Sequence, residues 1–469
     1  MKAIAVIILS TVILLSACRK DSFITSVDAR VTITADTLKY DTVFPTTGSV
    51  SQLFKIVNEN TQKLRLSSVK LMGGAGSAFK MNVDGTATTE ATNIEIEAND
   101  SVYVFVQVNV DPNAANLSFV IRDSIQVSYN GIRRLVQLEA WGQNAHFLRN
   151  KEITVDETWN NDLPYVILGY LHVNAGKKLT ISKGCRLYVH PDAPVIIDGT
   201  LQVNGLKDTG DRVYFLGDRL DDPYKYYPAS WPGIYFSPSS RDNILNYAVI
   251  KNSFQSIVVQ DPAPNNPTPK LILNECMIDN SYDFGIAASN SSIMAKNCLI
   301  SNCGKNIGLI KGGSYNFTNC TVVTISNPYI QHTNPVLQVT NFDATGPQAM
   351  TAIFRNCIFW GENGSVDTEV LVVKSVNTGA LTYVVDFSYN LWKVQNPPAG
   401  ITVNQSNSNA NPLFDSIDVS RRYYNFRLKP GPPPSPGIDK GTNAGIFIDL
   451  DGNPRPVGAG FDIGCFEKQ

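Results

Sequence analysis

The sequence predicts an all-β protein in which an N-terminal β-sandwich is followed by a parallel β-helix. Residues 30–142 contain short segments that alternate apolar and polar side chains, a pattern typical of half-buried strands. The residues that follow repeat a short motif, at a spacing of 22 positions in its most regular part, and no repeat has the spacing of a helix. With 469 residues, 43% of them hydrophobic, the chain is long enough for two or three folded units.

The first residues have the pattern of a secretory signal peptide. Lys2 precedes an apolar run over residues 3–15 that is too short to cross a bilayer comfortably. Because the run ends in the sequence LSAC, it resembles a bacterial lipobox. The resemblance implies cleavage before Cys18 and attachment of acyl chains such as palmitate to its thiol, which would anchor the protein in a membrane. Residues 1–18 are therefore expected to be a signal peptide, and residues 19–29 a polar tether.

Residues 30–143 are expected to form an immunoglobulin-like β-sandwich. Strand-like segments such as 53–57, 101–110 and 123–129 are separated by turn clusters rich in Asn, Gly, Pro and Asp. Short strands with a turn every ten or so residues are typical of a sandwich. The Cys…Trp…Cys pattern of true immunoglobulin domains is absent, so the likeness concerns the shape of the domain only.

The repeats predict a β-helix over residues 144–412. Cys276, Cys298 and Cys320 are spaced by 22 residues, and the aliphatic residues two positions after each follow the same spacing. One coil of this length cannot bury its apolar side alone, whereas stacked coils share a continuous core. Residues one period apart should then lie on adjacent rungs, about 4.8 Å apart.

This register predicts a column of buried thiols. Cys276, Cys298 and Cys320 should line up inside the core, with Cys357 continuing the row. The alternative, metal capture or redox chemistry, is less favoured because Ala248 occupies the same slot one coil earlier and because a free cysteine behaves as a small buried apolar residue.

A second column should lie at a corner of the coils. Asn252, Asn280 and Asn302 occupy equivalent positions of successive repeats, at spacings of 28 and 22 residues, and asparagine tolerates the left-handed backbone that a sharp corner needs. Stacked asparagine side chains can also bond to one another along the column. The column resembles the asparagine ladder of pectate-lyase-like β-helices.

The C-terminal stretch carries three short motifs, in residues 435–441, 449–455 and 462–467. They resemble the closing segment of the choice-of-anchor Q right-handed β-helix proteins, with departures at Gly437, Lys440 and Cys465. The resemblance implies a right-handed coil and a C-terminal cap over residues 413–469. The layout is also similar to that of Bacteroidetes surface lipoproteins.

Composition argues against several classes of function. With 39 basic and 41 acidic residues, the chain has a net charge of −2 and lacks the electrostatic footprint of a nucleic-acid-binding protein. Its four histidines are scattered, so a zinc enzyme is not expected. The cysteines that follow Cys18 are odd in number and form no CxxC motif, which argues against a disulfide scaffold.

The segment 217–236 interrupts the repeats and is expected to be a loop, where function tends to lie. One hypothesis is that the aromatic side chains of this loop form a sugar-binding platform. The alternative is that the loop is a packed lid, in which these side chains cover the first coils. A third has three aspartates holding Ca²⁺ against uronate groups, with Arg219 or Lys225 as the base of a polysaccharide lyase. No aspartate column at the repeat spacing supports the lyase. The candidate ligand-binding residues are Tyr224, Tyr226, Tyr227, Trp231, Tyr235, Asp218, Asp221 and Asp222.

The sequence thus favours a non-catalytic lipoprotein anchored in the outer membrane, whose β-helix binds glycan or contacts outer-membrane proteins. It is expected to face the cell surface, with the periplasmic face as the alternative. The alternative is a Ca²⁺-dependent polysaccharide lyase or related carbohydrate-active enzyme. No catalytic residue, metal site or cofactor is assigned, apart from the Ca²⁺ of that alternative. Short triplets that begin at Asp36, Asp41, Asp123 and Asp415 resemble the O-glycosylation sites of Bacteroidetes secreted proteins.

Overall fold

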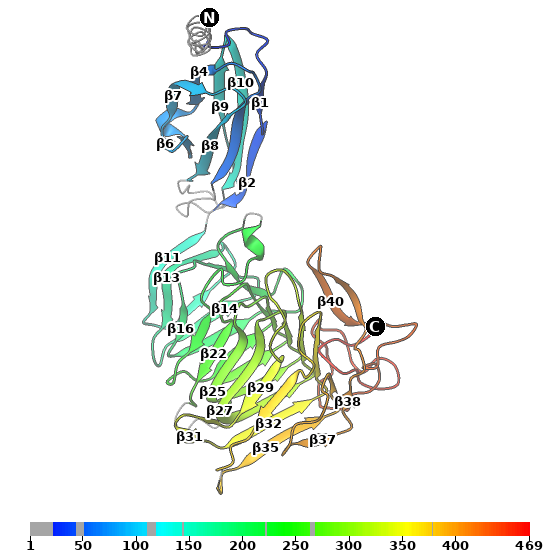
Figure 1. Cartoon of the computed structure of the whole chain (residues 1–469). Coiled ribbons are helices and arrows are strands. Elements are labelled where there is room, and N and C mark those ends of the chain that lie inside the picture. Colours follow the sequence, from blue (N-terminus) through cyan, green and yellow to red (C-terminus); the bar gives the residue numbers. More distant parts are fainter. Residues whose placement is uncertain are drawn as a thin grey trace, which may run out of the picture. The chain divides into compact units, whose positions relative to one another are not determined.

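The all-β prediction is confirmed by a computed structural model, which describes residues 22–43, 51–109, 119–142, 145–220, 223–262, 268–377 and 379–469 (Figure 1). Within these ranges the helical segments are two single 3-10 turns, η1 (Gly74–Gly76) and η2 (Tyr224–Tyr226). In the same ranges no helix has the length and apolar character required to cross a membrane. The chain forms two compact units, residues 1–144 and residues 145–469. Cys18 lies outside the described residues.

The first unit is a β-sandwich of two five-stranded sheets around one apolar core. Its strands are antiparallel except for one parallel pair, β2 with β10. Strict alternation produces the core: in β8 every second residue, from Val102 to Val108, is buried. The first sheet contains β1 (Val31–Ile33), β3 (Gln52–Asn58), β8 (Ser101–Val108), β5 (Phe79–Val83) and β6 (Thr86–Ala87). The second contains β2 (Thr37–Val43), β10 (Ile132–Gly142), β9 (Phe119–Tyr129), β4 (Leu64–Leu71) and β7 (Glu90–Ile96).

The second unit is a β-helix in which every rung pairs in parallel with the next, on three faces. The first face contains β11 (His146–Ile153), β13 (Tyr165–Val173), β15 (Arg186–Val189), β18 (Val213–Gly217), β21 (Ala248–Lys251), β24 (Met277–Asp279), β26 (Leu299–Ser301), β28 (Thr321–Ile325), β33 (Ile358–Glu362), β36 (Leu391–Trp392) and β38 (Asn407–Ser408). The second contains the later parts of β11 and β13, then β16 (Val195–Ile197), β19 (Ile234–Phe236), β22 (Ile257–Gln260), β25 (Phe284–Lys296), β27 (Lys305–Thr318), β29 (Leu337–Thr340) and β34 (Val370–Val373).

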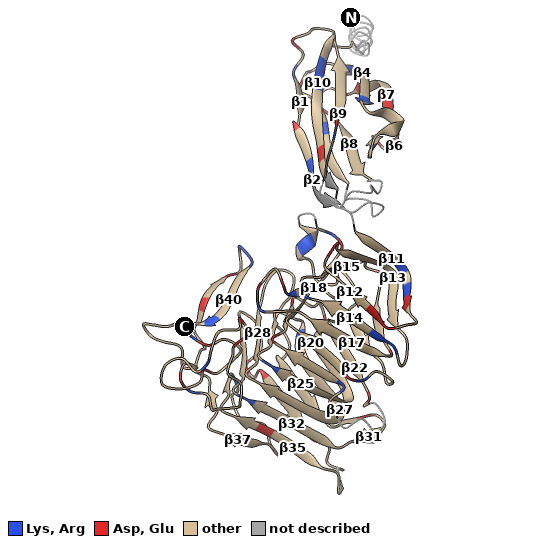
Figure 2. Ribbon diagram, turned by 180° about the vertical axis from the view of Figure 1, so that it is seen from behind, with Lys and Arg blue, Asp and Glu red and all other residues tan. Residues whose placement is uncertain are grey.

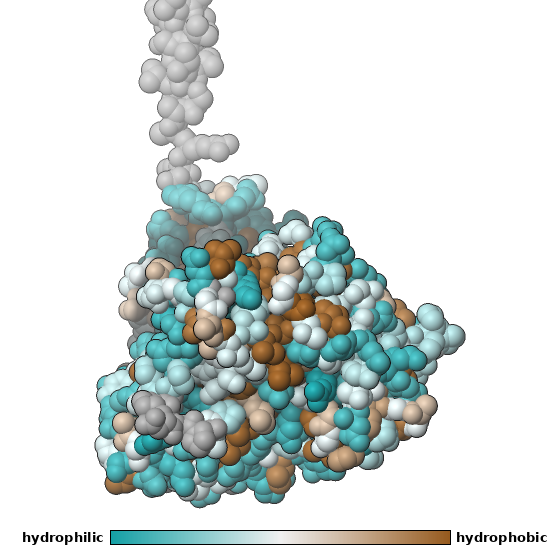
Figure 3. All heavy atoms as spheres, turned by 90° about the horizontal axis from the view of Figure 1, so that it is seen from below, coloured by the Kyte–Doolittle hydropathy of each residue, from teal (hydrophilic) through white to brown (hydrophobic). Residues whose placement is uncertain are grey.

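The third face contains β12 (Glu157–Trp159), β14 (Lys178–Ser182), β17 (Thr200–Asn204), β20 (Asn243–Asn246), β23 (Leu271–Asn274), the later parts of β25 and β27, β32 (Met350–Arg355), β35 (Tyr383–Ser388) and β37 (Thr402–Asn404). Two hairpins leave the coils: β30 (Phe342–Asp343) with β31 (Gly346–Pro347), and β39 (Phe414–Asp418) with β40 (Tyr423–Leu428). Seen from the end with the last coils, the surface is mainly hydrophilic with separate apolar patches (Figure 3). Val384 and Val403 are among the exposed apolar residues of those coils.

The predicted repeat and the predicted thiol column are confirmed. Ile278 pairs with Ile300, and Ile300 with Val322, so the residues one period apart are neighbours across rungs. The thiols two positions earlier therefore stack, and all are buried and free. Burial raises the pKa of the thiols at 276, 298 and 320, as expected for apolar core residues. The row continues to Cys357, because Val322 pairs with Phe359 on the next rung, two positions after Cys357.

The asparagine corner is confirmed in its backbone and only partly in its ladder. Asn252, Asn280 and Asn302 have φ values of 63°, 60° and 51°. Asn280 Nδ2 donates to Asn252 Oδ1 at 2.8 Å, as a ladder requires. Asn302 instead donates to Asp279 Oδ1 at 3.3 Å, so the ladder has one link among these three residues.

A second left-handed column was not foreseen. Glu275, Asn297, Asn319 and Asn356 have φ between 50° and 53°, and each directly precedes a cysteine of the buried row. The signal was visible in the sequence, because three of the four cysteines follow an asparagine. This column is important because its asparagine side chains bind the C-terminal segment, residues 429–469.

The C-terminal segment lies along the side of the β-helix, which differs from the end cap expected from the sequence. Backbone carbonyls of the segment accept hydrogen bonds from the second column: Ile448 from Asn297, Asp462 from Asn319 and Thr442 from Asn356. The segment and hairpin β39–β40 close a second apolar core against the first face. This contact explains why all five residues of β28 are buried.

Candidate functional site

Four chain segments of the β-helix unit enclose a groove of about 910 Å³ at the asparagine corner. They are the loop after β18, the corner itself, the segment after β28 and the tip of hairpin β39–β40. We call this space the corner groove. The lining residues on which the argument rests are Arg219, Lys225, Tyr226, Lys251, Asn252, Asp279, Asn280, Tyr329, Arg421, Arg422 and Tyr424.

The corner asparagines hold one wall of the groove in place. Asn252 Nδ2 donates to the carbonyl oxygen of Lys225 at 2.8 Å, and Asn280 Nδ2 donates to that of Tyr226 at 2.9 Å. These carbonyls belong to η2, the single turn that carries two of the predicted platform residues, Tyr224 and Tyr226. The repeat that builds the β-helix therefore also positions the tyrosine loop.

Tyrosine rings from distant parts of the chain meet in and beside the groove. Tyr224 and Tyr227 have ring centroids 5.3 Å apart, and Tyr227 lies 5.1 Å from Tyr329. Tyr226 and Tyr424 line the groove directly. The structure thus brings together the tyrosines at 224, 226 and 227, and adds two that sequence reasoning missed. No local signal could have found those two, because only the coiling of the chain brings them to the loop.

Two aromatic residues of the predicted platform lie elsewhere. Trp231 is only 1% exposed and belongs to the core of the β-helix, where its Nε1–H donates to the carbonyl oxygen of Lys251 at 2.8 Å. Its ring therefore has no face free for a ligand. Tyr235 is half-buried, donates its hydroxyl hydrogen to the carbonyl oxygen of Pro232, and does not line the groove. Burial raises the pKa of Tyr235.

Asp218 is engaged inside the protein. Its side chain is 4% exposed, and its Oδ2 lies 2.6 Å from Nδ1 of His190. This hydrogen bond raises the pKa of His190. Asp221 and Asp222 lie outside the described residues, and the described part of the chain holds no group of three or more residues suited to a metal ion. The described residues therefore do not form the Ca²⁺ site that the lyase alternative requires.

Most strand residues of the β-helix are uncharged (Figure 2). The groove, in contrast, is lined by five basic residues among those that the structure describes. The guanidinium of Arg422 lies 4.2 Å from the centroid of Tyr226 and 5.3 Å from that of Tyr329. Arg219 lies 3.9 Å from the ring of Tyr224. On the corner, Lys251 forms an ion pair with Asp279 at 3.1 Å. The groove thus combines aromatic faces, amides and cations.

Replacing Asn280 with glycine is expected to loosen the loop without straining the corner. Glycine adopts positive φ freely but cannot donate to Tyr226, so we expect a loss of stability of about 1–2 kcal/mol. Hydrogen exchange at the backbone amides of Tyr226 and Tyr227, which close the turn, should become faster. The matched control is Asn290→Gly, a left-handed asparagine away from the groove. Equal exchange in both variants would show that the corner does not hold the loop.

No protein-family model matches the sequence, and no curated protein matches it. Among solved structures, the catalytic domain of a GH87 alpha-1,3-glucanase in complex with tetrasaccharides has 8% identity and a TM-score of 0.24, covering 80% of this chain and 90% of that one. A PapD-like (ASH) domain of human CEP192 has 12% identity and a TM-score of 0.18, covering 27% of this chain and 92% of that one. A family 123 glycoside hydrolase from Clostridium perfringens has 11% identity and a TM-score of 0.19, covering 26% of this chain and 30% of that one. Similarities this low carry no argument about function.

Proposed function

We propose that the protein is a non-catalytic glycan-binding lipoprotein and that the corner groove receives the glycan. The observation that carries the proposal is the convergence of tyrosine rings and side-chain amides on one groove. Ring faces can stack on the apolar faces of sugars, while amides and guanidinium groups bond to hydroxyl groups. The volume of about 910 Å³ falls within the usual range of ligand sites.

The proposed location is the outer membrane, with the acylated Cys18 as anchor and the β-sandwich as a spacer between the anchor and the binding unit. The support for the anchor comes from the LSAC sequence that ends the N-terminal apolar run. Contact with outer-membrane proteins is the alternative role for the same unit. A pull-down that recovers a membrane protein, together with a failure to bind any glycan, would favour that alternative.

Removing groove tyrosines should weaken glycan binding by the full chain. We expect Tyr226→Ala and Tyr329→Ala each to reduce affinity about tenfold, which corresponds to about 1.4 kcal/mol, in a glycan array followed by calorimetry. The matched control is Tyr282→Ala, since that ring is 56% exposed and lies outside the groove. The proposal fails if no glycan binds, or if the control variant loses as much affinity as the groove variants.

The same samples test the enzymatic alternative. Incubating the full chain with uronate polymers and Ca²⁺ would release unsaturated products that absorb ultraviolet light if the protein were a lyase. The formation of such products would replace the non-catalytic function proposed above.

A further inference from the structure

Hairpin β39–β40 brings two adjacent arginines into the corner groove. Arg421 and Arg422 occupy the turn between the two strands, and both line the groove. Asp418 fixes this turn, because its Oδ1 accepts hydrogen bonds from Ser420 Oγ at 2.6 Å and from the backbone N–H of Arg421 at 3.1 Å. These hydrogen bonds lower the pKa of Asp418, so its carboxylate is ionised and stabilises the turn.

The guanidinium of Arg422 has a defined position. It lies over Tyr226 at 4.2 Å and is also 5.3 Å from Tyr329, two rings that come from separate segments. Arg422 reaches this position with φ of 55°, a backbone conformation that non-glycine residues seldom adopt outside constrained sites. A guanidinium held against rings in this way still has donor edges to offer to a planar anion.

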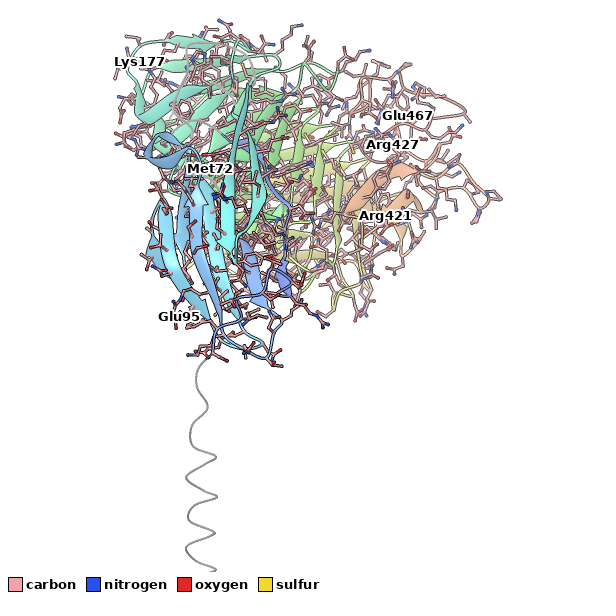
Figure 4. All side chains as sticks on the ribbon, turned by 90° about the horizontal axis from the view of Figure 1, so that it is seen from above. Met72, Glu95, Lys177, Arg421, Arg427 and Glu467 are labelled. Atoms are coloured by element: carbon pink, nitrogen blue, oxygen red, sulfur yellow. The ribbon has the colours of Figure 1, made fainter. Side chains whose placement is uncertain are left out.

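Arg421 remains open to solvent. Its side chain is 85% exposed, and its Nε lies 3.5 Å from Oδ2 of Asp418, longer than a strong charge-assisted hydrogen bond. Figure 4 shows this residue on the hairpin, together with Arg427 on β40. The turn therefore presents one positioned and one accessible guanidinium side by side.

The described lining of the groove is cationic although the whole chain is slightly acidic. Besides Arg421 and Arg422, the described lining contains Lys251, which is paired with Asp279, and Arg219 and Lys225, which have interactions of their own. The chain as a whole has a net charge of −2. From the two guanidinium groups of the turn, one held against Tyr226 and Tyr329 and the other 85% exposed, we infer that the groove binds an anionic glycan, whose carboxylate or sulfate groups are bound by Arg421 and Arg422. The inference rests on the proposed function and names its ligand class.

Nucleic acid is the other polymer that combines negative charge with groups that stack on aromatic rings. The net charge of −2 disfavours it, because nucleic-acid binding relies on basic side chains that neutralise many phosphates. A sugar polymer needs only local positive charge where its acidic groups fall. The glycan is therefore the ligand that the charge distribution favours.

Matched polymers test the inference with the full chain. The probes are polygalacturonate and its methyl ester, heparin and its desulfated N-acetylated form, and a thymidine oligonucleotide, each measured by calorimetry at two salt concentrations. We expect at least one acidic polymer to bind tenfold or more tightly than its neutral partner, with an affinity that falls as salt rises. Arg422→Gln and Arg421→Gln should each weaken binding of the acidic polymer about tenfold more than binding of its neutral partner.

The control variant is Arg241→Gln, an exposed arginine of the same unit outside the groove, and the unfolding midpoint of each variant verifies that it folds. Equal binding of acidic and neutral partners, or glutamine variants that keep the preference, would overturn the inference while the proposed function stands. If no polymer of the panel or the array binds, the proposed function fails and the inference with it. Preferential binding of the oligonucleotide would contradict both.

Discussion

Replacing Trp231 with alanine is expected to lower the free energy of unfolding of the β-helix unit by about 3–5 kcal/mol. The indole is 1% exposed in the main core, so its removal leaves a large cavity among packed apolar side chains. The substitution also leaves the carbonyl oxygen of Lys251 without its indole donor. Denaturant unfolding, followed through the transition of residues 145–469, measures the loss.

Two further variants separate the causes. Trp231→Phe keeps most of the volume and loses the hydrogen bond, so it should cost less than half as much as alanine. Tyr224→Ala removes a ring that is 38% exposed and should change stability by no more than about 0.5 kcal/mol. A loss below about 1 kcal/mol for the alanine variant would mean that Trp231 is a surface residue, as the platform hypothesis assumed.

The case of Trp231 also shows where sequence reasoning stopped. The regular repeats determined which side chains face the core, because a residue one period from a buried neighbour is buried as well. The segment 217–236 interrupts the repeats, so the sequence does not indicate which of its side chains face the core. In the structure Trp231 pairs with Ser253 of the next coil, a contact that no spacing within the segment indicates.

The C-terminal segment illustrates a different limit. Its three motifs were recognised, but their place was not, because motifs report a local conformation and not the surface against which it packs. The partners are left-handed asparagines of three separate coils, more than eighty residues away from the segment in sequence. An end cap and a lateral cover would both satisfy the same motifs.

The groove was only partly predictable for the same reason. The composition of the tyrosine loop identifies it in the sequence, whereas Tyr329 reaches it from the segment after β28, and Arg422 and Tyr424 reach it from hairpin β39–β40. The stacking of coils can be predicted from the repeat spacing. A hairpin that leaves the coils follows no such spacing, so its position cannot be predicted in this way. Sequence reasoning therefore found one wall of the site and missed the opposite one.

The C-terminal segment, which shares a core with hairpin β39–β40, contains a buried ion pair. Breaking this ion pair should have the second large effect. Glu467 and Arg455 have fully buried side chains, with Oε2 of the carboxylate 3.6 Å from Nε of the guanidinium. Glu467 also accepts hydrogen bonds from the backbone N–H groups of Val457 at 2.8 Å and Asp462 at 3.1 Å. Burial raises the pKa of Glu467 and lowers that of Arg455, so each charge depends on the other.

Glu467→Ala should therefore lower the free energy of unfolding of this unit by about 3–5 kcal/mol, because it leaves a buried cation without its partner. The double variant Arg455→Met/Glu467→Leu should recover most of the loss, since apolar residues of similar size avoid the cost of burying charge. A double-mutant cycle built on unfolding midpoints measures the coupling. Additive losses would show that the two side chains act independently.

The same variant should also open the groove, because the hairpin and the C-terminal segment share one core. Phe426 and Leu428 of β40 are buried together with Leu450 and Phe466 of the segment, and Arg427 forms an ion pair with Asp451. If Glu467→Ala releases the segment, the hairpin loses this support, and glycan affinity should fall together with stability. The double variant should restore both. Recovery of stability without recovery of binding would mean that the hairpin holds its position by other contacts.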